Sequence, residues 1–225
     1  MASPNPTQIE PAERGPRPTL LFRHAPGLIL LAIALADLWR MADPDLWGHV
    51  RFGQDAIRAG HVLWRDRYSY TAAGHLWLNH EWLTEVIMGA LYNWMGVFGI
   101  KLMKLACSAL IVIFLAAAGA ETGAPPLLRV AALLGAVSTI NWQVQYRPQA
   151  FTFALLSALL YLLARDCFGF ARKPDSWRIG RLWLAVPMLA LWANLHGGFI
   201  MGVAALWVYA AVSGAQAIFA GRGPR

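Results

Sequence analysis

The feature that most constrains this chain is a series of apolar blocks separated by short polar segments. The blocks lie at about residues 28–42, 82–98, 100–120, 125–141, 149–164, 182–195 and 198–220. A helix that crosses about 30 Å of hydrocarbon needs roughly 17–25 residues, so several blocks need flanking residues in order to span. Apolar residues make up 58% of the chain and charged residues 14%, whereas soluble globular chains have about 45–50% and about 25%. The sequence therefore predicts an all-α, polytopic transmembrane helical bundle.

The composition also argues against several other classes of protein. A chain this rich in apolar residues does not stay solvated, so it is not disordered throughout. The cysteines are Cys107 and Cys167, both in or beside apolar runs, which is not a disulfide framework. The formal charge of +7 comes from basic residues that lie between the apolar blocks, so it indicates a bilayer protein and no nucleic-acid partner. No Walker loop, Rossmann glycine fingerprint, CxxC or HExxH motif is found, so no cofactor is predicted.

The N-terminal region differs from the rest of the chain. Residues 1–25 are polar and rich in proline, with Arg14, Arg17 and Arg23, which predicts a disordered cytoplasmic tail. The tail is too long and too rich in proline for a cleaved signal peptide, so the first apolar block is expected to remain as an anchor. The second predicted unit is therefore a transmembrane module over residues 26–221.

A hydrophilic segment, residues 43–81, separates the first two apolar blocks. Residues 45–59 are expected to form an amphipathic helix on the membrane surface, ended by Gly60, with one face made of Leu46, Val50, Gly53 and Ile57. Residues 68–71 and 76–78, separated by a glycine-containing turn, predict a small hairpin.

The block at 82–98 decides the topology, because it is short enough to lie in the interface without crossing. Cytoplasmic segments collect Lys and Arg. If 82–98 does not span, the chain has six spans and most of its basic residues lie inside, with Lys101 and Lys104 counted on the outer side. If it spans, most of the basic residues lie outside. The six-span arrangement is therefore predicted, with the N-terminus cytoplasmic. It brings three polar segments to the same outer side: residues 43–81, 143–149 and 194–198.

Two acidic residues follow the first predicted span directly. Asp43 and Asp45 flank a proline at the start of the predicted amphipathic helix. One interpretation is helix capping, because an Asp at this position accepts backbone N–H bonds. The other is a general base, because a carboxylate at the membrane edge can accept a proton from an attacking hydroxyl group. Both can hold, one residue for each.

A second titratable group opens the 82–98 block. His80, Glu81 and Trp82 are consecutive, and they are either first-turn and interfacial residues of a helix or part of a site. Four of the six histidines lie in the preceding segment: His49, His61, His75 and His80. Their spacing matches no zinc pattern, so no metal site is predicted.

The two remaining polar turns carry further candidates. Arg147 precedes a proline, and it either extends toward lipid headgroups or binds a phosphate through its guanidinium fork. Asn194 and His196 precede two glycines between apolar blocks. A tight turn explains the glycines, but it does not explain Asn194 and His196 together.

These motifs resemble the GT-C superfamily of bacterial membrane glycosyltransferases, which use polyprenyl-phosphate-linked sugars and include the aminoarabinose transferases and protein mannosyltransferases. The resemblance covers about residues 28–205. It is carried by the run Asp43-Pro44-Asp45-Leu46-Trp47-Gly48-His49, then by Gly53, Gly60, Asp66, Ser69, Gly74, Trp77 and His80-Glu81-Trp82-Leu83. In this fold an acid follows the first span on the outer face. Glu81 lies near the place of the second acid, and His196-Gly197 stands where many members have Lys-Gly.

The resemblance implies an inverting glycosyltransferase on the periplasmic face of a bacterial inner membrane. The implied catalytic residues are Asp45, assisted by Asp43 or Glu81, and the implied substrate-binding residues are His80, Trp82, Arg147, Asn194 and His196. The implied partners are a lipid-linked sugar and membrane lipids. Members of this group usually continue with further spans and a soluble domain, so a missing C-terminal domain or partner subunit is expected. The alternative is a non-catalytic component: a fragment, a transporter half or a binding subunit.

Overall fold

The structure is a computed structural model that describes residues 20–37, 43–143, 145–172 and 179–219. Every regular element in these ranges is a helix, as the sequence predicts. The predicted tail at 1–25 lies mostly outside the described residues, but residues 20–25 are already helical, so the first helix begins earlier than expected.

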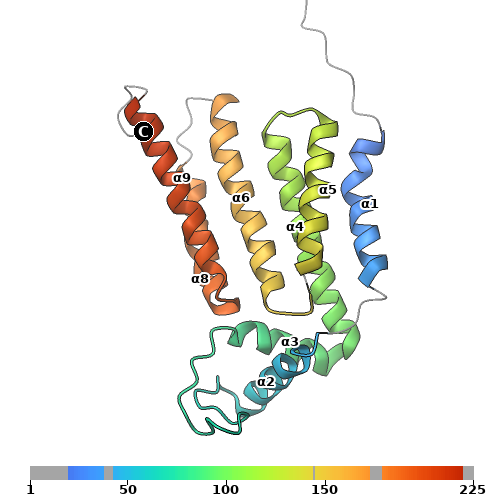
Figure 1. The fold of residues 1–225 in the computed structure, drawn as a ribbon, viewed down its shortest axis with the longest axis vertical. Helices are drawn as coiled ribbons and strands as arrows, with labels where there is room; N and C mark the ends of the chain where they lie inside the picture. The colour runs from blue at the N-terminus through green and yellow to red at the C-terminus, as the bar shows by residue number, and fades with distance from the viewer. Residues whose placement is uncertain (1–19, 38–42, 144, 173–178, 220–225) are drawn as a thin grey trace, which may run out of the picture.

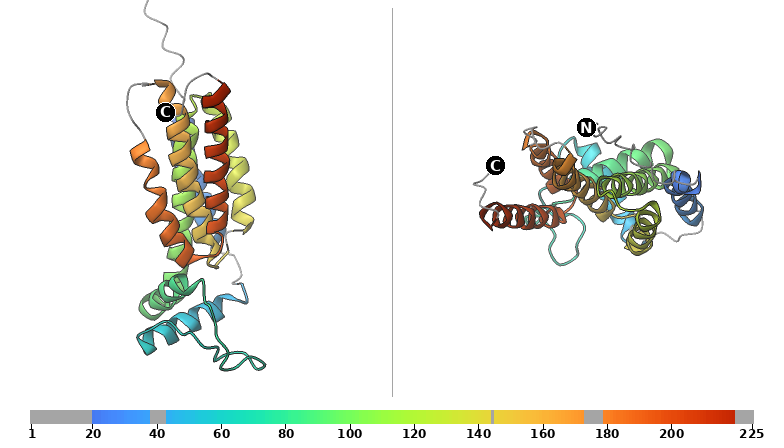
Figure 2. Two further views of the ribbon diagram at one scale, coloured as in Figure 1. Left: turned by 90° about the vertical axis from the view of Figure 1, so that its left-hand side faces the viewer. Right: turned by 90° about the horizontal axis from the view of Figure 1, so that it is seen from above.

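The long axis of the molecule is set by a bundle of helices that run side by side (Figures 1 and 2). α1 lies at one edge of the bundle and α9 at the other (Figure 1). The helices of the bundle are α1 (Leu20–Asp37), α4 (Val97–Glu121), α5 (Pro126–Gln143), α6 (Gln149–Arg172), α8 (Ala185–Leu195) and α9 (Phe199–Phe219), with the short α7 (Ile179–Leu182) before α8.

Within the described ranges, three helices are long and apolar enough to cross a membrane. They lie at Val97–Glu121, Gln149–Phe168 and Phe199–Gln216, and shorter apolar helices lie at His24–Ala36, Pro126–Ile140 and Ala185–Leu195. This is fewer than the six spans that the sequence predicts. The reason is length: the 11 residues of α8 rise only about 16 Å, roughly half of the hydrocarbon thickness.

The hydrophilic segment and the 82–98 block form a cap at one end of the bundle. The cap contains α2 (Leu46–Ala59), α3 (Trp82–Met95) and the loop between them (Figure 1). α3 packs against α2 and does not run along the bundle axis. It ends at Gly96, whose φ of 59° turns the chain into α4. The cap therefore meets the polar turns before α6 and after α8.

The predicted amphipathic helix is present as α2. Leu46, Val50 and Gly53 are buried as expected, whereas Ile57 is 40% exposed. Gly60 ends the helix in the left-handed region, with φ of 72°. The hairpin predicted at 68–78 was wrong in detail, because the described loop has only one isolated antiparallel bridge, between Arg65 and Leu76.

α2 and α3 cross at two glycines. A Cβ atom at Gly53 would lie 1.7 Å from the carbonyl oxygen of Glu85, and one at Gly89 would lie 2.6 Å from the backbone nitrogen of Gln54. Such distances are excluded by steric repulsion, so only glycine permits the two backbones to approach this closely. The close crossing brings His49 on α2 next to Glu85 on α3.

Lys104 is a charged residue inside an apolar helix. It lies within α4, as the apolar block at 100–120 predicts, and it is fully buried. Its Nζ lies 4.9 Å from the centroid of the Tyr146 ring, next to the apolar cluster beneath the cap.

Candidate functional site

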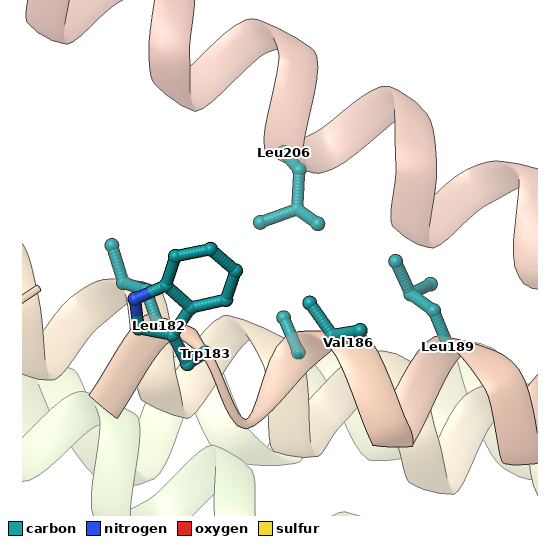
Figure 3. Close-up of a pocket in the computed structure, with 6 residues that line it drawn as sticks. Leu182, Trp183, Val186, Leu189 and Leu206 are labelled. Carbon is teal, nitrogen blue, oxygen red and sulfur yellow. The ribbon is translucent and has the colours of Figure 1, made fainter. Parts of the chain in front are cut away.

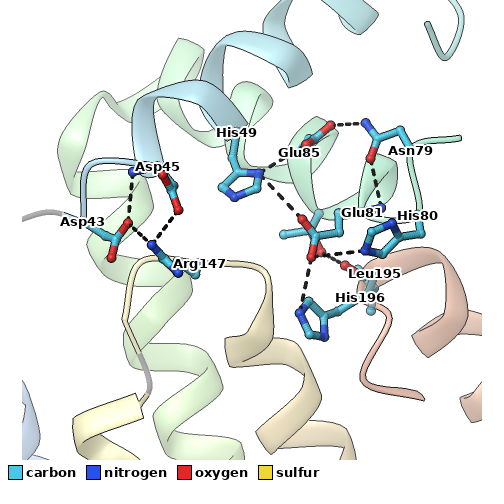
Figure 4. Close-up of polar contacts among 11 residues, drawn as sticks. Asp43, Asp45, His49, Asn79, His80, Glu81, Glu85, Arg147, Leu195 and His196 are labelled. Atoms are coloured by element: carbon cyan, nitrogen blue, oxygen red, sulfur yellow. Dashed lines mark hydrogen bonds and ion pairs between the residues drawn. The ribbon is translucent and has the colours of Figure 1, made fainter. Parts of the chain in front are cut away.

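Two polar clusters lie where the cap meets the bundle (Figure 4). The first, called here the Arg147 cluster, contains Asp43, Asp45 and Arg147. The second, called the Glu81 cluster, contains His49, Glu81, Glu85 and His196, with Asn79 and His80 beside it. Six of the eight residues proposed from the sequence therefore meet in two adjacent groups.

The Arg147 cluster joins the start of the cap to the turn before α6. The Nη2 atom of Arg147 donates to Asp43 Oδ1 at 2.6 Å and to Asp45 Oδ2 at 2.5 Å. The carboxylates differ in accessibility, because the Asp43 side chain is 10% exposed and the Asp45 side chain 62%. One nitrogen atom thus contacts both acids, and the exposed acid is the one that a ligand could reach.

The pairing fixes the charges of this cluster. Burial raises the pKa of the Asp43 carboxyl, but the hydrogen bond from Arg147 and the one from the Asp45 backbone outweigh it, so the pKa lies below its ordinary value. The hydrogen bond to Asp43 raises the pKa of Arg147. The capping interpretation applies to Asp43 alone: its Oδ1 accepts the backbone N–H of Asp45 at 2.9 Å, whereas the Asp45 side chain makes no cap hydrogen bond.

The Glu81 cluster joins α2, α3 and the turn after α8. His49 Nδ1 lies 3.2 Å from Glu85 Oε1 and 3.9 Å from Glu81 Oε2. On its other side, Glu81 Oε1 lies 3.3 Å from Nε2 of His196 and 3.7 Å from Nε2 of His80. Glu85 is almost fully buried, and its second oxygen accepts a hydrogen bond from the Asn79 amide.

The hydrogen bonds of His196 determine its tautomer. The backbone N–H of Gly198 donates to His196 Nδ1 at 2.9 Å, so Nδ1 is an acceptor and the proton of the neutral ring is on Nε2, toward Glu81. The hydroxyl of Thr152 also lies 2.9 Å from Nδ1 and accepts the Trp192 indole N–H. Burial lowers the pKa of His196, more than the nearby Glu81 raises it, so the ring is held neutral.

The other proposed binding residues are engaged at the edge of the site. The indole N–H of Trp82 donates to Asn194 Oδ1 at 3.0 Å, and the Asn194 amide donates to the carbonyl of Ala190 at 2.8 Å. The His80 side chain is 65% exposed. Trp82 and Asn194 therefore tie α3 to α8, and His80 has the most accessible side chain of the Glu81 cluster.

Sequence reasoning missed the partners that complete the Glu81 cluster, which are Glu85, Asn79 and Thr152. One signal could have identified part of it. His49 is four residues before Gly53 and Glu85 is four residues before Gly89, so each titratable residue shares a helix face with a glycine that permits close approach. His61 and His75, which are also in the loop, are exposed and lie outside both clusters.

An apolar hollow lies elsewhere in the bundle (Figure 3). It is lined by Leu182, Trp183, Ala185, Val186, Leu189 and Leu206. These residues surround the first turns of α8, whereas His196 follows its last turn. None of the lining residues has an ionisable group, so the chemistry of the site lies in the two polar clusters.

No protein-family model matches this chain, and no curated protein or solved structure matches it either. The likeness to GT-C glycosyltransferases thus has its basis in the sequence motifs.

Proposed function

We propose that this chain is a membrane glycosyltransferase that moves a sugar from a polyprenyl-phosphate donor to an acceptor hydroxyl group, with inversion at the anomeric carbon. The observation that carries the proposal is the contact of Arg147 with both Asp43 and Asp45 at the end of an apolar bundle. A polyprenyl chain would lie in the hydrocarbon, so its phosphate would lie at this same boundary.

Arg147 suits a phosphate ligand because part of its guanidinium remains available. Its hydrogen bonds to the two acids use Nη2, and its Nε is buried without a hydrogen-bond partner. A phosphate can bind a guanidinium through two parallel N–H bonds. The incoming phosphate would compete with the exposed Asp45 for Arg147, while Asp43 stays paired.

The release of Asp45 from Arg147 would make it the base. The carboxylate of Asp45 would then be free to accept the proton of the acceptor hydroxyl group as a general base. The acceptor oxygen would form a bond to the anomeric carbon from the face opposite the phosphate, and the bond from that carbon to the phosphate oxygen would break. Arg147 would stabilise the negative charge on the departing polyprenyl phosphate. Glu81 and the neutral His196 would position the sugar at the adjacent cluster.

Sugar transfer by purified protein tests the proposal directly. With a radiolabelled polyprenyl-phosphate sugar, Asp45→Asn should lower turnover by about 10²–10⁴-fold, the usual contribution of a general base. Asp55→Asn is the matched control, because Asp55 is an acid of the same helix that pairs with Arg51 and Arg58 outside both clusters. Wild-type turnover by Asp45→Asn would refute the assignment.

The proposal includes the membrane topology, with six spans, the cap on the periplasmic side of a bacterial inner membrane and a cytoplasmic N-terminus. Single cysteines in a cysteine-free background test it. Tyr70, fully exposed in the cap loop, is replaced by cysteine in one variant, and Ala124, between α4 and α5, in another. An impermeant thiol reagent added to spheroplasts should label position 70 and leave position 124 unlabelled. The reverse pattern would place the site in the cytoplasm and contradict the proposal.

One observation favours the second candidate, a non-catalytic membrane component. Arg147 is paired with two acids, and in this second candidate the pairs fasten the cap to the bundle and bind no ligand. In that case Arg147→Lys would retain function in the assembled complex, and purified protein would release no sugar from the donor.

A further inference from the structure

We propose that His49, Glu81 and Glu85 together bind one divalent metal ion, of the type that accepts mixed imidazole and carboxylate ligands. Each residue offers one ligand atom, and the three atoms all lie within 4.8 Å of one another. One imidazole nitrogen with two carboxylate oxygens suits Zn²⁺ or Mn²⁺ better than it suits Mg²⁺ or Ca²⁺, which prefer oxygen alone.

The spacing of the ligand atoms agrees with coordination of a single ion. Zn–N and Zn–O bonds are about 2.0–2.2 Å long, so neighbouring ligand atoms of a tetrahedral site lie about 3.4 Å apart. His49 Nδ1 is 3.2 Å from Glu85 Oε1 and 3.9 Å from Glu81 Oε2. Small rotations of the Glu81 side chain would be enough to close the site around an ion.

The oxygens that do not face His49 have partners of their own. Glu85 Oε2 accepts a hydrogen bond from Asn79, and Glu81 Oε1 faces the Nε2 proton of His196. Metal-binding carboxylates are commonly held in this way, with outer partners that orient them toward the ion. The remaining oxygens, Oε1 of Glu85 and Oε2 of Glu81, both face Nδ1 of His49.

The negative charge of the two glutamates favours the binding of a cation. The Glu85 side chain is 4% exposed and the Glu81 side chain 19%. Glu85 lies within ion-pair distance of His49, and Glu81 lies within ion-pair distance of His49, His80 and His196. Buried carboxylates require a compensating positive charge, and the nearby Arg147 is committed to Asp43 and Asp45.

The scaffold of the site is rigid, and one side of it is accessible. The ligands come from α2 and from the start of α3, which cross at Gly53 and Gly89 without space for a single Cβ atom. Three protein ligands leave at least one coordination position for water or a substrate oxygen, as in catalytic metal sites. The partly exposed His49 and Glu81 form the open side.

Metal binding by the full-length chain in detergent tests the proposal. After treatment with EDTA and gel filtration, titration calorimetry with Zn²⁺ should give about one site per chain in the wild type. His49→Ala and Glu85→Gln should each weaken that site by at least about 10-fold, because each removes a ligand. His75→Ala, which changes an exposed histidine of the same loop, should bind as the wild type does. Mn²⁺, observed by electron paramagnetic resonance, should be displaced by Zn²⁺ only in the wild type and in His75→Ala.

The variants also separate metal binding from folding. Glu85→Gln keeps an oxygen that can accept the Asn79 hydrogen bond, so its circular dichroism and gel-filtration profile should match those of the wild type. A wild type that binds no Zn²⁺ at micromolar concentrations would overturn the proposal. Equal binding by wild type, His49→Ala and Glu85→Gln would also overturn it. The test uses no sugar donor, so its result is independent of the proposed glycosyl transfer.

Discussion

The Arg147 cluster and the Glu81 cluster lie side by side (Figure 4), yet their charges are balanced in different ways. In the first, a guanidinium that is charged at every physiological pH contacts two carboxylates. In the second, two carboxylates contact imidazoles, which carry a charge only when they are protonated. The Arg147 cluster thus always holds one positive charge against its two carboxylates, whereas the positive charge of the Glu81 cluster depends on protons or on a metal ion.

The two clusters therefore differ in how they connect the cap to the bundle. The Arg147 cluster connects the cap to the turn before α6 in a way that ordinary changes of pH leave intact. The Glu81 cluster connects α2, α3 and the turn after α8 through contacts between carboxylates and imidazoles. The geometry of the Glu81 cluster also depends on Gly53, Gly89 and Thr152. The contacts of the Arg147 cluster depend on one atom, Nη2 of Arg147. The four predictions below test this contrast, from the largest expected effect to the smallest.

Gly53→Ala should have the largest effect, and it should act on the Glu81 cluster. The added methyl group would overlap the backbone of Glu85, so α2 must move away from α3, at a cost of about 3 kcal/mol. The melting temperature in detergent should fall, and Zn²⁺ binding should be lost. Gly48→Ala is the control in the same helix, because its methyl group would meet only the Phe52 side chain at an ordinary 3.7 Å. Equal melting temperatures of the two variants would contradict the close crossing.

Thr152→Val should have the next largest effect. The substitution removes the acceptor of the buried Trp192 indole N–H and one partner of His196. An unsatisfied buried donor costs about 1–3 kcal/mol, so the variant should unfold at a lower temperature. The histidine NMR signals should also show a weaker preference for the Nε2–H tautomer. Thr152→Ser keeps the hydroxyl group, and a loss as large as that of Thr152→Val would point to methyl packing instead.

Acidification should affect the two clusters at different pH values. Burial depresses the pKa of His196 below its ordinary 6.5, so the unfolded chain binds more protons there, and stability should decrease as the pH falls below 6.5. The pKa of Asp43 lies below its ordinary 3.8, so its contribution is present above 3.8 and is lost only as the pH falls below that value. Melting curves from pH 8 to pH 3 measure both. His196→Gln should remove the upper decrease and Asp43→Asn the lower one; an unchanged upper decrease in His196→Gln would assign it to other histidines.

Arg147→Lys should have the smallest effect on stability, less than about 1 kcal/mol, because a single nitrogen atom makes both contacts and the pairs are partly exposed. Binding of the sugar donor should weaken, however, since an ammonium group lacks the guanidinium fork. Melting temperature and KM for the polyprenyl-phosphate sugar measure the two effects. A variant with unchanged KM would show that Arg147 only fastens the cap.

Much of the local structure could be predicted from the pattern of residues. The face of α2, its end at Gly60 and the helical class follow from apolar periodicity and glycine geometry, which act over a few residues. The number of spans could not be obtained in this way, because α8 and the apolar parts of α1 and α5 are shorter than their apolar blocks suggested. The hairpin was also wrong, because strand pairing depends on partners that the loop does not supply.

The candidate site was predictable in part. Asp43, Asp45, Arg147, Glu81 and His196 were identified as charged or polar residues at the ends of apolar blocks. The division of these residues into two clusters was not identified. The sequence does not show that Arg147 pairs with the two aspartates or that His196 pairs with Glu81. Glu85 and Thr152 were missed because each lies within a largely apolar helix. The composition of such a helix does not indicate which of its few polar residues is part of a site.

The sequence by itself determined that this chain forms apolar helices with its reactive groups between them, because hydrophobic burial and helix geometry act along the chain. Only the tertiary structure decided which groups face one another. The close crossing of α2 and α3 places His49 between Glu81 and Glu85, and the turn after α8 adds His196. A site of this kind joins residues more than a hundred positions apart, and distances across a fold are set by packing rather than by sequence spacing.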